Sequence, residues 1–151
     1  MEPQPARGLS RRVGGVRGSA IRDLLALTSR GDVISLAGGL PAPEFIPRDV
    51  IAEHAQAALT QPGSVQYAET CGLPELRDAL AARESARIGR AISAREVVVT
   101  HGSQQALSLL SQVLLDPRDD VVVETPTYPG ALQVFQAAGA QIHTVGIDED
   151  G

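Results

Sequence analysis

The chain has 151 residues, 43% of them hydrophobic, and a formal net charge of -5. This size suits one globular domain with a core, and the negative charge, without a basic run mixed with aromatic residues, argues against nucleic-acid binding. No stretch approaches the ~20 apolar residues of a membrane span, and the N-terminus lacks the apolar core of a signal peptide, so we expect a cytoplasmic protein.

The residue inventory limits the chemistry that this chain can perform. All 13 basic residues are arginine, so the chain contains no lysine. The one cysteine, Cys71, has no internal disulfide partner, which is typical of a reducing compartment. His101 and His143 stand apart from any cysteine or carboxylate group with ligand spacing, so the sequence predicts no metal site.

The N-terminal part of the chain begins with an arm. Residues 1–18 are rich in Gly, Pro and Arg and show no apolar periodicity, which predicts a segment without a core of its own. Ser19 then caps a short predicted helix that carries Arg22, and a strand is expected over residues 33–37. The glycine pair at 38–39 predicts an irregular turn, either a plain one or one that a ligand approaches closely.

Two helices are expected in the next part of the chain. Proline at a first helical position and apolar residues at helical spacing predict helices from Pro47 to about residue 60 and from Pro74 to about Gly89. Tyr67 stands between them in a short extended piece, where a half-buried aromatic residue is the simplest interpretation.

The stretch around which the chain is organised is residues 97–110, VVVTHGSQQALSLL. Its valines predict a buried strand over residues 96–100, and its leucines predict a helix from Ser103 onward. At such a junction the first N–H groups of the helix lack intrahelical partners and the helix dipole is positive, so a phosphate can be held beside Ser103 and Gln104. The alternative is that Ser103 merely caps the helix.

Strand and helix alternate in the remaining residues. A strand over 120–124 leads through a loop to a short helix over 131–138, and a third strand follows over 141–147. Such alternation with short connections predicts an α/β fold with a parallel sheet and right-handed crossovers.

Four separated pieces of the chain resemble the fold type I PLP-dependent aminotransferases of class I/II. They are SLAGGLPAPEFIP at 35–47, residues 65–76, THGSQQAL at 100–107 and ETPTYPGAL at 124–132. Within that family the chain is similar to the branch of α-aminoadipate, kynurenine and aromatic aminotransferases. The resemblance implies an incomplete fold type I structure with an N-terminal arm and three strands of the large-domain sheet, in which the strands at 96–100 and 120–124 are not neighbours.

The resemblance also implies a cofactor, pyridoxal 5'-phosphate, and residues that hold it. Ser103 and Gln104 would bind its phosphate, and Tyr128 would stack on its ring. Tyr67 matches a tyrosine that reaches across the interface of a homodimer to the phosphate bound by the partner subunit.

The substrates implied by the resemblance are an amino acid and a 2-keto acid, between which an amino group is transferred. Gly39 would lie near the substrate carboxylate, whereas Ser19 and Arg22 would lie near the substrate side chain.

Complete members of this family are much longer, so we expect an N-terminal fragment. Its parts would be the arm at 1–18, a segment at 19–60 that contributes to the small domain and the pocket, and the first part of the PLP-binding large domain at 61–151. The lysine that holds the cofactor as a Schiff base lies downstream in the family. We therefore expect no catalytic residue in this chain, and no turnover by these residues alone.

The sequence leaves two other interpretations open. A truncated aminotransferase-like module that binds a partner or a phosphate ligand without catalysis fits the lack of lysine. A transcription regulator with an aminotransferase-like domain carries a winged helix before this region, and the arm at 1–18 leaves no room for one. The presence together of all four predicted cofactor-binding residues favours a truncated enzyme; they are Ser103, Gln104, Tyr128 and Tyr67.

Overall fold

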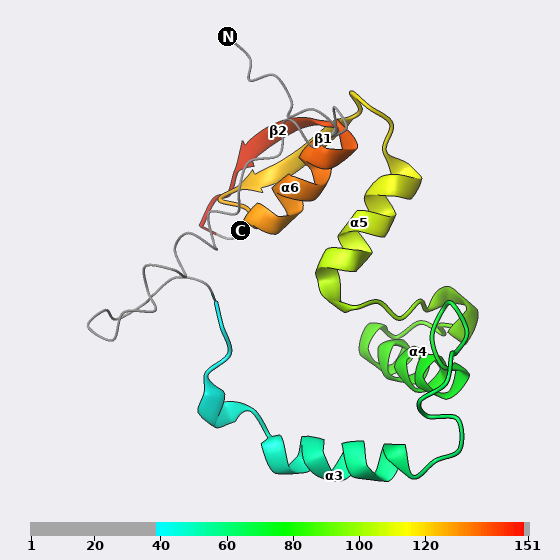
Figure 1. The fold of residues 1–151 in the computed structure, drawn as a ribbon. Coiled ribbons are helices and arrows are strands. Elements are labelled where there is room, and N and C mark those ends of the chain that lie inside the picture. Colours follow the sequence, from blue (N-terminus) through cyan, green and yellow to red (C-terminus); the bar gives the residue numbers. More distant parts are fainter. Residues whose placement is uncertain (1–38, 150–151) are drawn as a thin grey trace, which may run out of the picture. The chain divides into compact units, whose positions relative to one another are not determined.

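A computed structural model describes residues 39–149 of the chain (Figure 1). The predicted arm at 1–18, the helix after Ser19 and the strand at 33–37 lie outside the described residues. The described elements are η1 (Pro43–Phe45), α3 (Arg48–Leu59), α4 (Pro74–Ile88), η2 (Ala94–Glu96), α5 (Gly102–Leu114), β1 (Asp120–Thr125), α6 (Pro129–Ala138) and β2 (Gln141–Gly146). They divide into two compact units, Leu40–Thr100 and residues 101–149.

The second unit contains a parallel pair of strands with its crossover helix. β1 and β2 pair from Asp120 opposite Gln141 to Thr125 opposite Gly146, and α6 connects them (Figure 1). Parallel strands need a crossover between them, because the chain must return to the same end of the sheet. The predicted strands at 120–124 and 141–147 and the helix between them are therefore confirmed, as is the α/β class.

The prediction of a strand over residues 96–100 is wrong. Glu96 ends the short helix η2, and the residues from Val97 to Thr100 belong to no assigned strand. Val97 has extended dihedral angles, and the Val99 N–H donates to the carbonyl oxygen of Cys71 at 2.9 Å. Valine side chains favour an extended backbone, but a strand also needs a neighbour to share its hydrogen bonds, and the unit Leu40–Thr100 contains no other strand.

In the first unit, α3 and α4 confirm the two predicted helices. Arg77 of α4 is 14% exposed and connects this helix to the segment after it. Its guanidinium donates to the carbonyl oxygens of Ala94 at 2.6 Å and Val97 at 3.0 Å, and it forms an ion pair with Glu69 at 3.3 Å. The arginine thus supplies donors that a neighbouring strand would otherwise provide.

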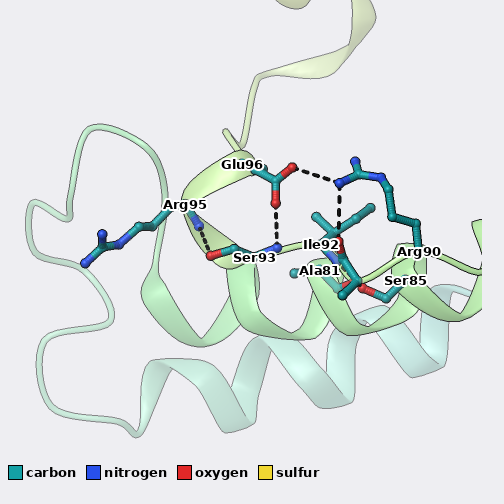
Figure 2. A network of polar contacts seen from close by, with 8 residues as sticks. Ala81, Ser85, Arg90, Ile92, Ser93, Arg95 and Glu96 are labelled. Atoms are coloured by element: carbon teal, nitrogen blue, oxygen red, sulfur yellow. Dashed lines mark hydrogen bonds and ion pairs between the residues drawn. The ribbon is translucent and has the colours of Figure 1, made fainter.

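A polar network closes the turn between α4 and η2 (Figure 2). Ser93 and Glu96 form a reciprocal capping box, in which the Ser93 N–H donates to Glu96 Oε2 at 2.8 Å. The other carboxylate oxygen of Glu96 pairs with Arg90 at 3.2 Å. Ser85 joins this turn to α4, because its Oγ accepts from the Ile92 N–H at 2.8 Å and donates to the carbonyl of α4 one turn earlier at 2.7 Å.

Replacing Arg77 by alanine should destabilise the unit Leu40–Thr100. The carbonyl oxygens of Ala94 and Val97 would lose charged donors at a part-buried site, which costs about 2 kcal/mol or more. Urea unfolding followed by circular dichroism measures this loss. The matched control is Arg87→Ala on the same helix, because Arg87 is 69% exposed and its surface pair with Glu84 contributes less than about 0.5 kcal/mol. Equal losses in the two variants would contradict the role given to Arg77.

The capping box should respond to pH through Glu96. The Ser93 N–H, and then Arg90, lower the pKa of the Glu96 carboxyl below its ordinary value of 4.5. A lowered pKa means that the stabilisation is fully present above the ordinary value and is lost as pH falls through the lower, folded value. The Ser93 amide proton, followed by NMR, should therefore titrate with a midpoint below 4.5. Glu96→Gln keeps an acceptor oxygen and should remove this titration; a midpoint at or above 4.5 in the unsubstituted protein would refute the assignment.

Candidate functional site

The first turn of α5 carries a serine hydroxyl beside main-chain N–H groups. The helix begins at Gly102, and its N-cap residue is His101, whose side chain makes no capping hydrogen bond. Ser103 is therefore the second helical residue and not the cap, so the capping interpretation is wrong. Its Oγ has no hydrogen-bond partner within residues 39–149. A free hydroxyl thus lies beside N–H groups that have no partner inside the helix.

Gly102 leaves room at this helix end. Its φ is +77°, which is the left-handed region that favours glycine, and among the described residues no atom outside the adjoining chain lies within 4 Å of the position that a Cβ would occupy. Residues 102–104 are exposed within the described part of the chain, and α5 is 13 residues long, so its dipole is fully developed. An anion placed here meets N–H donors and a positive potential without any lysine or arginine.

A side-chain hydrogen bond joins this helix end to the beginning of α6. Gln104, the third residue of α5, donates from Nε2 to the carbonyl oxygen of Gly130 at 3.0 Å. Gly130 is the second residue of α6, and this helix follows the carboxyl end of β1 after a short loop. Two helix N-termini therefore meet just beyond the carboxyl end of a parallel strand, where α/β sheets bind their ligands.

Tyr128 lies directly against Gly130. A Cβ placed on Gly130 would lie 2.6 Å from both Cε1 and Cζ of the Tyr128 ring. The ring is 52% exposed, so it contacts the glycine main chain while about half of its surface remains accessible. This surface is flat and apolar, which suits stacking against another ring.

Sequence reasoning did not identify Gly130. The sequence places it in the loop before the helix predicted over 131–138, whereas α6 begins at Pro129. A glycine inside a helix costs about 1 kcal/mol relative to alanine and usually has a packing reason. The packing reason here is the tyrosine two residues earlier in the chain.

The remaining predicted site residues are distributed as follows. Tyr67 belongs to the unit Leu40–Thr100, and it is 99% exposed, so its interpretation as a half-buried aromatic residue is wrong. Gly39 has a φ of +55°, in agreement with the predicted turn that needs glycine. Ser19 and Arg22 lie outside the described residues. The structure therefore brings together Ser103, Gln104 and Tyr128 of the predicted set.

The described part of the chain contains neither a group of potential metal ligands nor a helix suited to a membrane. Within residues 39–149, no three His, Cys, Asp or Glu side chains gather in a way that could hold a metal ion. None of the helices in that range has the length and apolar character needed to cross a membrane.

Residues 32–151 match the family described as aminotransferase class I and II. The chain belongs to this family. An aromatic-amino-acid aminotransferase of Thermococcus litoralis is 42% identical to it over 139 residues, which are 91% of this chain and 33% of the relative. The crystal structure of an archaeal alanine:glyoxylate aminotransferase matches with a TM-score of 0.86 and 41% identity over 95% of this chain and 37% of that one.

A second solved structure is informative about the cofactor of this family. The α-aminoadipate aminotransferase LysN of Thermus thermophilus was crystallised with N-(5'-phosphopyridoxyl)-L-leucine, and it matches with a TM-score of 0.77 and 39% identity over 95% of this chain and 34% of that one. The predicted aminotransferase family and pyridoxal phosphate as its cofactor are thereby confirmed. The chain spans about a third of the length of these relatives.

Proposed function

We propose that the protein containing these residues is a PLP-dependent aminotransferase, which transfers an amino group between an amino acid and a 2-keto acid. The observation that supports this most is the meeting of two helix N-termini at Gly130, with Tyr128 beside them. The non-catalytic alternative is not favoured, because the similar proteins are named aminotransferases.

The first turn of α5 fits the phosphate of the cofactor. Ser103 would donate its hydroxyl, and the main-chain N–H groups of the turn would complete the site. The Gln104 side chain donates from Nε2 to Gly130 and so is directed to the start of α6. We assign its contribution to the phosphate to its main-chain N–H. The start of α6 adds a second positive helix end to the same region.

Tyr128 fits the ring of the cofactor. The accessible face of its ring would stack on the pyridine and shield that face of the pyridine from water. The Tyr128 ring itself lies against the main chain of Gly130. When bound, the cofactor supplies an electron sink that lets the α-carbon of an amino acid lose a proton. The amine that must anchor the cofactor is not available within these 151 residues, since all 13 basic residues are arginine.

The other predicted roles remain proposals. The full exposure of Tyr67 supports a position at an interface, where it would reach the phosphate site of the partner subunit in a homodimer. Gly39 would lie near the substrate carboxylate, with Ser19 and Arg22 near the substrate side chain. We also retain the proposed division into an arm at 1–18 and segments at 19–60 and 61–151, and a cytoplasmic location.

Replacing Ser103 by alanine should weaken binding of pyridoxal phosphate. A hydrogen bond to a charged group contributes about 1.5–3 kcal/mol, so we expect the dissociation constant to rise about tenfold or more. The measurement is equilibrium dialysis of pyridoxal phosphate against the product of the longest reading frame that contains these residues. Ser108→Ala, one and a half turns further along α5, is the matched control and should leave the dissociation constant unchanged. Equal effects of the two substitutions would remove Ser103 from the phosphate site.

The same protein tests the activity. Supplied with pyridoxal phosphate, amino acids one at a time and 2-oxoglutarate as acceptor, it should convert at least one amino acid to its keto acid. The 151-residue chain alone should show no turnover under these conditions, because it has no lysine for the Schiff base. Absence of transfer by the longer protein with every donor and acceptor tried would count against the proposed function, and turnover by the short chain would overturn its inertness.

A further inference from the structure

Gly130 occupies a position where the backbone does not require glycine. Its φ is not in the left-handed region, unlike that of six other glycines among the described residues. It lies inside the first turn of α6, where most residues form better helices. What excludes a side chain there is the Tyr128 ring, since a Cβ would lie 2.6 Å from two of its carbon atoms and 2.7 Å from its hydroxyl oxygen. The glycine therefore determines where the ring can lie.

Gln104 fixes the glycine in turn. Its Nε2 reaches from α5 to the carbonyl oxygen of Gly130 at 3.0 Å, in a part-buried contact between residues 26 positions apart. This hydrogen bond fixes the orientation of the Gly130 peptide group, against which the Tyr128 ring lies. It also connects this peptide group to α5, whose first turn carries Ser103. Displacement of Gly130 would move the tyrosine away from the phosphate end of the site.

We propose that Gly130 and the side chain of Gln104 are positioning residues for Tyr128, and that through Tyr128 they set the orientation of the bound cofactor ring. This inference rests on the proposed function. Neither group needs to contact the cofactor. Gly130 has no side chain and so leaves room for the tyrosine ring, and the Gln104 side chain holds Gly130 close to the N-terminus of α5.

The test of Gly130 is a double-mutant cycle in the longest reading frame that contains the chain. Gly130→Ala, Tyr128→Ala and the double variant are compared by the dissociation constant of pyridoxal phosphate and by the circular dichroism of the bound cofactor. Gly130→Ala alone should raise the dissociation constant about tenfold and reduce the cofactor signal. In the Tyr128→Ala background the same substitution should change neither, because the ring that an alanine would meet is gone.

Gln104→Met supplies a second variant that introduces neither the steric clash nor a charge near the phosphate. It keeps the side-chain length but removes the donor to Gly130, so it should raise the dissociation constant several-fold and change the cofactor circular dichroism. Gln112→Met is its control, because Gln112 donates to Ser108 on its own helix, and it should change neither measurement.

The outcomes separate this inference from the proposed function. If the unsubstituted protein binds no pyridoxal phosphate, the proposed function and the inference both fail. If it binds, but Gly130→Ala raises the dissociation constant equally with and without Tyr128, the positioning role is refuted while the proposed function stands. Loss of the effect in the Tyr128→Ala background, together with a changed cofactor signal in Gln104→Met, supports the inference.

Discussion

The candidate site depends on one hydrogen bond, from the Gln104 side chain to the Gly130 carbonyl at 3.0 Å. It joins the first turns of α5 and α6, so that two positive helix ends lie together beyond the carboxyl end of β1. The phosphate end of the site and the tyrosine that would carry the ring are thereby held at a constant separation. Because α5 and α6 also pack against each other, the bond adds a polar contact at the ends that carry Ser103 and Tyr128.

In the unit Leu40–Thr100 too, a side chain forms hydrogen bonds with main-chain groups that would otherwise pair with main-chain partners. Residues 97–100 have the composition of a buried strand, yet Val97 and Val99 form hydrogen bonds with Arg77, Ala94 and Cys71 and not with a second strand. The guanidinium of Arg77 donates to the carbonyl oxygen of Val97, which a sheet ladder would otherwise pair, and to that of Ala94 in η2. The capping box of Ser93 and Glu96 closes the turn that precedes this segment (Figure 2).

The local sequence pattern predicted α3, α4, α6, β1 and β2 correctly. Apolar spacing, and the proline and glycine residues that begin or end an element, depend only on residues within each segment. The local pattern failed at residues 97–100, because three valines cannot reveal whether a neighbouring strand is present. The resemblance to aminotransferases predicted Ser103, Gln104 and Tyr128 as site residues, but it could not predict that Gln104 would bind Gly130. That contact joins residues 26 positions apart, and only the packing of α6 beside α5 creates it.

The most direct test of the central claim, that the α5 N-terminus holds the cofactor phosphate, is phosphorus NMR of pyridoxal phosphate bound to the protein. A free phosphate monoester gains its second proton with a pKa of about 6. A phosphate held by N–H donors and a helix dipole should remain dianionic, so its resonance should stay constant as pH is varied around that value. A bound resonance that titrates like the free cofactor would contradict the account.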